Sequence, residues 1–250
     1  ATARKITMVN PKVDENGMPM YPIDPSEWTV GNSAYDSLYA DEFDEKAADK
    51  KANGLADTYG LSDKIHERFY VGYHGVTLPH KFKICVGGCP NNCAKPSLND
   101  LGIIGQKVPM IDYSKCRGCN KCQVVESCPI KIAEVVDGKI NINPNECNNC
   151  GRCAGKCPFG ALEEYQYGFK VYVGGRWGKK VAHGQPLNKI FTSEEEVMDL
   201  VESAILLFRD EGISGERFAD TINRLGFDYV EDKLLNNKID KDAILKKTVK

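Results

Sequence analysis

Eleven cysteines, all between residues 85 and 157, are the residues of this 250-residue chain with the clearest chemistry. Eight of them form two runs of the same kind. The first is Cys116-x2-Cys119-x2-Cys122-x5-Cys128-Pro129, and the second is Cys147-x2-Cys150-x2-Cys153-x3-Cys157-Pro158. Thiolates that are two residues apart on a tight loop can bind several irons of one cubane cluster. The spacing therefore predicts iron–sulfur chemistry, and hence electron transfer.

The two runs resemble the pattern of bacterial two-cluster ferredoxins, in which the cysteine before the proline binds the other cluster. The resemblance implies two [4Fe-4S] clusters with crossed ligands. One would be held by Cys116, Cys119, Cys122 and Cys157, and the other by Cys147, Cys150, Cys153 and Cys128. The first run has five residues before its last cysteine rather than three, which lengthens a loop but keeps the number of ligands. Zinc is the alternative, but two triplets that are each followed by Cys-Pro fit a zinc site poorly.

Three further cysteines, Cys85, Cys89 and Cys93, lie in the nine-residue stretch CVGGCPNNC. Its two glycines and its proline disfavour a regular helix. A glycine-rich loop exposes backbone N–H groups, which can donate hydrogen bonds to cluster sulfurs and tune the reduction potential. We therefore expect a loop that could hold a third cluster, with free thiols as the alternative.

The composition limits the class of protein. A net charge of −2, from 33 basic and 35 acidic residues, argues against non-specific binding to nucleic acid or to an anionic membrane surface. No apolar run approaches the ~18 residues of a membrane helix, and the first ten residues lack the apolar core of a signal peptide. Disulfides are rare in reducing cytosol, and an odd number of cysteines fits a disulfide framework poorly. We expect a cytoplasmic protein with no membrane and no nucleic-acid partner.

Helices and strands must position these cysteines. The apolar pattern predicts helices over 57–70, 193–212 and 214–226, and strands over 82–86, 101–105 and 169–177. Asp137-Gly138 between alternating apolar residues predicts a β-hairpin. Ser193 and Glu196 have the spacing of a capping box at the start of the second of these helices. A charged helix is expected over 41–52, and a lysine-rich tail from about residue 231.

The stretch LPHKFKICVGGCPNNCAKPSLNDLGIIG resembles the cluster-and-siroheme segment of sulfite and nitrite reductases. The likeness resumes after the cysteine-rich part in FKVYVGGRWGKK, GQPL and DEGISGERFADTINRLGF, and it covers roughly residues 55–230. It is strongest to the small anaerobic and dissimilatory-type enzymes with an inserted ferredoxin domain. The implied fold is α+β, a sulfite-reductase-like α/β half-domain with an inserted bacterial 2[4Fe-4S] ferredoxin domain.

The implied organisation has four parts. They are a polar, extended segment over 1–54, a siroheme/[4Fe-4S] domain over 55–110 and 165–230, a ferredoxin domain over 111–164, and a tail over 231–250. Enzymes of the family reduce sulfite to sulfide, or nitrite to ammonia, at a siroheme that shares a cysteine thiolate with a third [4Fe-4S] cluster. By resemblance Cys89 and Cys93 bind that cluster, with Cys93 as the bridging thiolate. Lys81 and Lys83 would contact the anionic substrate, and Arg176 a siroheme carboxylate.

The chain departs from the family pattern in its first cysteine pair. The spacing puts Lys46 and Ala52 where that pair should lie, and no cysteine precedes Cys85. Cys85 replaces a small residue and could supply a third ligand, with the fourth from His80, a partner chain or an exogenous thiolate. Each cation also has a plainer interpretation: the two lysines could face solvent, Arg176 could be a turn residue, and His74 and His80 could be structural.

Three functions follow from these features. The first is a sulfite reductase-like oxidoreductase, in which electrons pass from a donor protein or subunit through the ferredoxin domain to siroheme and a small inorganic anion, sulfite or nitrite. The alternative is a non-catalytic electron-transfer subunit that has lost siroheme. A redox sensor with a labile cluster at Cys85, Cys89 and Cys93 is the third. In the first two, the chain works in an oligomer or larger complex.

Overall fold

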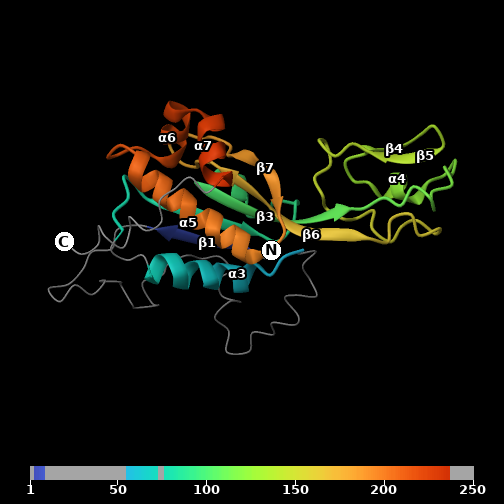
Figure 1. The fold of residues 1–250 in the computed structure, drawn as a ribbon, viewed down its shortest axis with the longest axis horizontal. Helices are drawn as coiled ribbons and strands as arrows, with labels where there is room; N and C mark the ends of the chain where they lie inside the picture. Colours follow the sequence, from blue (N-terminus) through green and yellow to red (C-terminus); the bar gives the residue numbers. More distant parts are fainter. Residues whose placement is uncertain (1–2, 9–54, 73–75, 237–250) are drawn as a thin grey trace.

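A computed structural model describes residues 3–8, 55–72 and 76–236 (Figure 1). In this part of the chain, a five-stranded sheet has the order β1-β2-β3-β6-β7. The strands are β1 (Ala3–Met8), β2 (Phe82–Gly87), β3 (Leu101–Pro109), β6 (Tyr165–Val173) and β7 (Gln185–Phe191). β2 and β3 are parallel, and the other neighbours are antiparallel.

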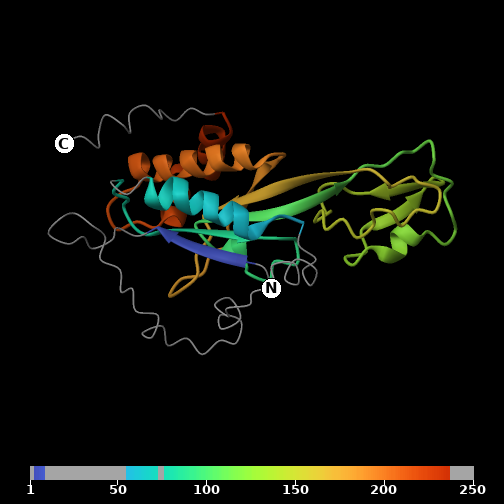
Figure 2. The same cartoon turned by 90° about the horizontal axis from the view of Figure 1, so that it is seen from below.

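Helices cover one face of this sheet. They are α3 (Thr58–Ile65), which continues into a π-helical turn η2 (His66–Val71), and α5 (Glu194–Glu211), α6 (Phe218–Leu225) and α7 (Phe227–Leu235). Figure 2 shows α3 and α5 side by side over the strands. Every second residue of β2, Phe82, Ile84 and Val86, is buried in the core between sheet and helices. Rings of Phe82, Phe208 and Phe218 pack edge to face or tilted there, with centroids 5.1–5.9 Å apart.

The opposite face of the sheet is built for close contact with a loop. Cys85 on β2 lies beside Gly102 on β3, and the short helix η3 (Pro96–Leu98) crosses them. A Cβ on Gly102 would lie 2.5 Å from the Pro96 carbonyl carbon, and one on Gly87 would lie 2.8 Å from Pro96 Cγ. Small residues on these strands therefore let the segment that follows Cys89 fold back against the sheet.

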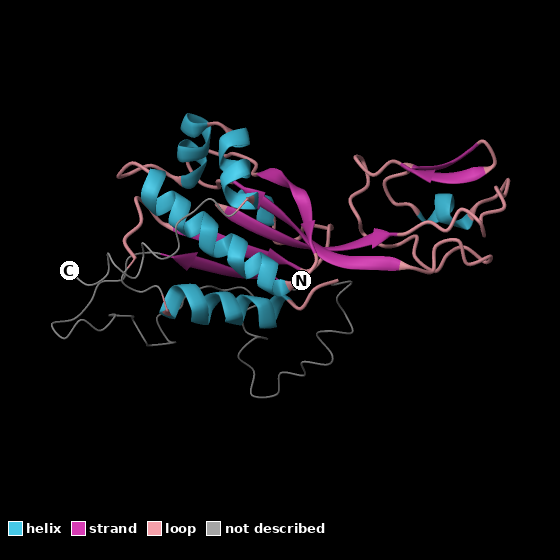
Figure 3. Ribbon diagram, viewed as in Figure 1, coloured by secondary structure: helices cyan, strands magenta, loops and turns pink. Residues whose placement is uncertain are grey.

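A cysteine-rich module follows β3 and leads into β6, and Figure 3 shows that it consists mostly of loops. It contains α4 (Gln123–Ser127) and the hairpin of β4 (Ala133–Val136) and β5 (Lys139–Ile142). Its own small core is separate from that of the sheet in the described part of the chain. That core comprises Val124, Ala133, Ile140, Ala161 and Leu162.

Most of the expected elements are confirmed. The hairpin turns at Asp137 and Gly138, whose φ angles of 50° and 71° match the tight turn that Asp-Gly predicts. The helix predicted over 57–70 begins after Asp57, whose side chain accepts a hydrogen bond from Gly60 N at 2.9 Å. The mixed α+β class is also confirmed. The helix expected over 41–52 lies outside the described residues.

Four details were wrong. The strand expected over 169–177 begins at Tyr165 and ends at Val173, and the helix expected from Ser214 begins at Phe218. Only half of the capping box forms: Ser193 Oγ accepts from Glu196 N, but the Glu196 carboxylate accepts from Thr192 N at 2.8 Å. The tail expected from residue 231 is helical up to Leu235, because apolar side chains such as Leu234 are buried against the core. None of the helices in the described ranges is long and apolar enough to cross a membrane.

Helix α5 supplies much of the core, which gives a test of the packing. Ile205→Ala on α5 removes a fully buried side chain, and we expect it to lower the free energy of unfolding by about 2–5 kcal/mol. Ile213→Ala, two residues after the helix, changes a side chain that is 56% exposed and should cost about 0.5 kcal/mol or less. Denaturant unfolding of both variants, followed by circular dichroism, checks the difference. Equal losses would contradict the position of α5.

Candidate functional site

The cysteine-rich module contains two cavities that are each lined by four cysteines. Cys116, Cys119, Cys122 and Cys157 line the first, together with apolar residues of the module core. Cys128, Cys147, Cys150 and Cys153 line the second. In each cavity, therefore, three cysteines of one run meet the last cysteine of the other run. These are the two sets that the ferredoxin pattern implied.

Backbone N–H groups point at several of these sulfurs. Ile140 N donates to Cys116 Sγ at 3.3 Å, and Asn149 N donates to Cys147 Sγ at 3.4 Å. Burial raises the pKa of Cys128, but the N–H groups of Ile132 and Ala133 outweigh that effect and hold this pKa below its ordinary value. Such donors stabilise thiolate sulfur and are typical of iron–sulfur sites.

At other thiols of the second cavity, the effect of burial prevails and the pKa is raised. Removal from water raises the pKa of Cys153 to about 11, and the neighbouring Cys147 adds to the increase. A buried thiolate is costly unless a positive charge lies beside it. A metal centre bound there would supply that charge and displace the protons. The donor set and its surroundings therefore fit a cationic iron cluster.

The three cysteines of CVGGCPNNC lie in different environments. Cys85 is buried on β2, where its Sγ lies 3.8 Å from the Ala94 carbonyl oxygen, while Cys89 is partly exposed and Cys93 is exposed. The loop after β2 runs through turns, with Asn92 and Lys95 at positive φ, so the expected absence of a helix is confirmed. Among the described residues, no three cysteine, histidine or carboxylate side chains converge on a single metal-ion position.

A third cavity joins this loop to the cysteine-rich module. From the loop side it is lined by Cys89, Pro90 and Asn91, together with Leu55. From the module side it is lined by Cys150, Gly151 and Arg152, together with Lys107 of β3. Cys150 thus borders both this cavity and the second four-cysteine cavity.

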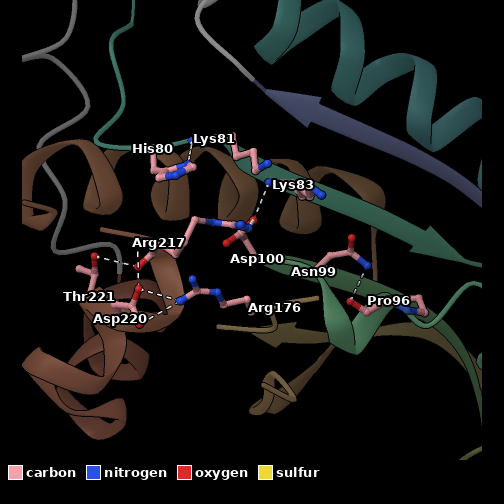
Figure 4. A network of polar contacts seen from close by, with 10 residues as sticks. All are labelled: His80, Lys81, Lys83, Pro96, Asn99, Asp100, Arg176, Arg217, Asp220 and Thr221. Carbon is pink, nitrogen blue, oxygen red and sulfur yellow. Dashed lines mark hydrogen bonds and ion pairs between the residues drawn. The ribbon is translucent and has the colours of Figure 1, made fainter. Parts of the chain in front are cut away.

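A group of cationic side chains lies at the start of β2 (Figure 4). It comprises Lys81, Lys83, Arg176 and Arg217, with His80 beside them. Lys81 and Lys83 flank the buried Phe82, and both lysines are half-buried. Neither is therefore a fully solvated surface residue. Arg176 and Arg217 reach the group from the segment after β6 and from the N-cap of α6.

Two buried residues that the sequence reasoning missed, Asp100 and Arg217, hold this group together. Arg217 Nη2 lies 2.6 Å from Asp100 Oδ2, and the same oxygen accepts a hydrogen bond from Lys83 N at 2.9 Å. The Arg217 side chain is 8% exposed, and the Asp100 side chain is fully buried, with 0% exposed. Burial raises the pKa of Asp100, an effect that the Arg217 charge opposes. Asp100 Oδ1 and Arg217 Nε have no hydrogen-bond partner in the described part of the structure, so both could bind a further polar group.

Arg176 and His80 have local partners. Arg176 Nη1 forms an ion pair with Asp220 Oδ2 at 2.9 Å, and its backbone pairs with Ala182, so it is more than a turn residue. His80 Nδ1 accepts from Lys81 N at 2.7 Å. Burial and the charge of Arg217 lower the pKa of His80. His74 lies outside the described residues.

The two ion pairs of this group differ in burial, which gives a matched test. Asp100→Asn would leave the buried Arg217 charge unpaired, and we expect it to reduce stability by about 3–5 kcal/mol. Asp220→Asn alters a carboxylate that is 43% exposed and should cost about 1 kcal/mol or less. Denaturant unfolding measures both. If Asp100→Asn reduced the stability as little as Asp220→Asn does, Asp100 would not be the residue that holds these side chains in place.

Comparison with known proteins shows which families and proteins this chain is similar to. The model of the nitrite and sulphite reductase 4Fe-4S domain matches residues 45–241. The coenzyme F420-dependent sulfite reductase of Methanocaldococcus jannaschii is 33% identical over 178 residues, which cover 70% of this chain and 27% of that protein. An uncharacterized ferredoxin of the same organism is 37% identical over 54 residues, 21% of this chain and 87% of that protein.

A solved structure agrees with the family match. The chain resembles dissimilatory sulfite reductase I with a TM-score of 0.52 and 21% identity, over 74% of this chain and 49% of that chain. At this identity the likeness shows the fold. The chain spans well under two thirds of the length of the F420-dependent relative. Because the family model covers most of the chain, the protein belongs to the nitrite and sulphite reductase 4Fe-4S domain family.

Proposed function

We propose that this chain is the iron–sulfur part of a sulfite-reducing enzyme. Electrons from a donor protein enter the two four-cysteine sites and pass to a third [4Fe-4S] site at Cys89 and Cys93. There they serve the reduction of a small oxyanion, sulfite or nitrite, beside a siroheme. The observation that carries this proposal is the position of Cys150, which borders both the second four-cysteine cavity and the cavity at Cys89.

The residues at the start of β2 fit the binding of anionic groups. Siroheme, when bound, supplies the iron at which the oxyanion is reduced. In this proposal Lys81 and Lys83 bind and orient the oxyanion, since their positive charge offsets its negative charge in a half-buried setting. Arg176 and Arg217 line the same region, and the Arg217 Nε that has no partner in the described residues can donate to a siroheme carboxylate. The lysines can also donate protons.

A second candidate is an electron-transfer subunit that does not itself bind siroheme. The sequence favours it in one respect, since no cysteine precedes Cys85 and the expected pair at Lys46 and Ala52 is absent. Arg176 and Arg217 also already have carboxylate partners, Asp220 and Asp100. In this case the chain would pass electrons to a partner. An assembly with other subunits is part of both proposals, and two similar proteins are named as subunits of sulfite reductases.

The ligand sets can be tested by counting iron. Cys150→Ala removes one ligand of the second set, and we expect it to lower the iron content by about four per chain. Asn141→Ala is the control, because Asn141 lies in the same module, is exposed and borders neither four-cysteine cavity. The iron of those two sites should remain in it. Iron analysis of anaerobically purified protein gives the result, and full iron in Cys150→Ala would refute the assignment.

A visible spectrum of the same preparation separates the two candidate functions. A siroheme band with about twelve non-haem irons per chain is the expected result for the catalytic proposal. An iron–sulfur shoulder alone, with about eight irons, would establish the electron-transfer subunit instead. Replacement of Lys83 by Met should then weaken sulfite-induced changes of the siroheme band, if that band is present.

A further inference from the structure

The two four-cysteine cavities differ in what surrounds them. The second is attached to the sheet, since Pro109 of β3 borders it and Cys150 forms a parallel bridge with Lys107. The stem of Lys107 also packs over Gly151, where an added Cβ would lie 2.6 Å from Lys107 Cγ. The residues that line the first cavity all lie within 116–162, in the module itself. Because the module extends beyond the sheet (Figure 1), the first cavity is the one that a partner can approach from outside.

Three exposed side chains line this first cavity. They are Arg117, Val135 and Phe159, and we call them the module face. Val135 is 37% exposed and Phe159 is 38% exposed, although both are apolar. The guanidinium carbon of Arg117 lies 4.3 Å from the centre of the Phe159 ring, which is a cation–π contact. Arginine and aromatic side chains are enriched at the centres of protein–protein interfaces, so the module face has the composition of a docking surface.

The backbone beneath the module face is held in place. Lys139 Nζ donates a hydrogen bond to the Cys116 carbonyl oxygen at 2.8 Å, which ties the β4–β5 hairpin to the loop of the first cysteine run. Gly118 has a φ of +60°, and a Cβ there would overlap the Gly138 carbonyl oxygen. The loop therefore packs directly against the turn of the hairpin. A surface that is ordered in advance loses less conformational entropy when a partner binds.

The charge of the module face selects the partner. Arg117 is the only lysine, arginine, aspartate or glutamate among the residues that line the first cavity. Lys121 is exposed in the same loop, and no carboxylate occurs in the sequence between Asp112 and Glu126. Asp112 itself forms an ion pair with Lys115 at 3.5 Å. The surface over the first cavity is therefore apolar with a positive rim, which complements a partner whose contact surface carries carboxylates.

We propose that the module face is the docking surface for an acidic protein that donates electrons. Carboxylates on the rim of that protein pair with Arg117 and Lys121, and an apolar patch packs against Val135 and Phe159. This inference rests on the proposed function, because it takes the electron donor of that proposal and states its charge and the place where it binds. Complementary charge also steers the two proteins toward each other before they make contact.

Two charge reversals in the same module provide a matched test. Arg117→Glu and Lys131→Glu change the net charge of the chain by the same amount. Arg117 belongs to the module face, whereas the exposed Lys131 lies between Ile130 and Ile132, which line the second cavity. The probe is an oxidised flavodoxin, a small acidic electron-transfer protein. Isothermal titration calorimetry measures its Kd for the anaerobically purified full chain and for each variant, at low and at high ionic strength.

We expect the wild type to bind the flavodoxin at low ionic strength. Arg117→Glu should raise the Kd about tenfold, and Lys131→Glu less than about twofold. The difference should shrink at high ionic strength, because salt screens exposed charges. Phe159→Ala should raise the Kd at both ionic strengths, since the contact that it removes is apolar. Iron per chain is measured for every variant, and if Arg117→Glu loses iron, Lys121→Glu takes its place, because Lys121 borders neither four-cysteine cavity.

Equal effects of the two charge reversals, or no binding of the flavodoxin by the wild type, would overturn the docking surface. Reduction by dithionite separates this failure from a failure of the proposed function. A protein with full iron that dithionite bleaches but that binds no flavodoxin would keep the proposed function and lose the docking surface. A protein that binds the flavodoxin through Arg117 but holds no iron would keep a surface for acidic proteins and lose the proposed function.

Discussion

The pairing of β3 with β6 is the interaction on which the rest of the structure depends. The two strands are antiparallel over their full lengths, from Leu101 opposite Val173 to Pro109 opposite Tyr165. The end of this pair at Leu101 and Val173 lies in the sheet under α5, and the end at Pro109 and Tyr165 extends beyond it to the cysteine-rich module. Because buried backbone N–H and C=O groups must be paired, this ladder fixes the register of both regions at once. The cysteine sites therefore have a defined position relative to β2.

Close approach of backbone to backbone is the second constraint. Because Gly87 and Gly102 have no side chains, Pro96 can pack directly against the sheet. A Cβ on Gly105 would likewise lie 2.6 Å from the Gly88 carbonyl oxygen. Leu55 N donates to that same oxygen at 2.6 Å, so the entry to α3 is tied to the loop that carries Cys89. The loop is thus held from both sides by atoms of the main chain. That rigidity suits a site that must keep thiolates and cations in a fixed relation.

Local signals made much of this arrangement predictable. The cysteine spacing, the Asp-Gly turn and the Ser193 cap depend on a few neighbouring residues, and each acts within one turn or loop. The ion pair of Asp100 and Arg217 was missed because its members are 117 residues apart and neither has a local pattern that marks it. The contact of Lys107 with Gly151 was missed for the same reason. The helix after Gly226 was missed because the lysine-rich composition beyond it outweighed the buried Val230 and Leu234.

The separate core of the module has a consequence for how the chain folds. β3 cannot pair with β6 until the ends of the intervening segment, 110–164, come together, and closing so long a loop costs conformational entropy. The module buries few apolar side chains of its own, so clusters held by its cysteines, as proposed, would add to its stability. Metal ligation inside the module would bring those ends together before the sheet forms. Iron bound in the module would then favour the formation of the sheet as well as that of the module.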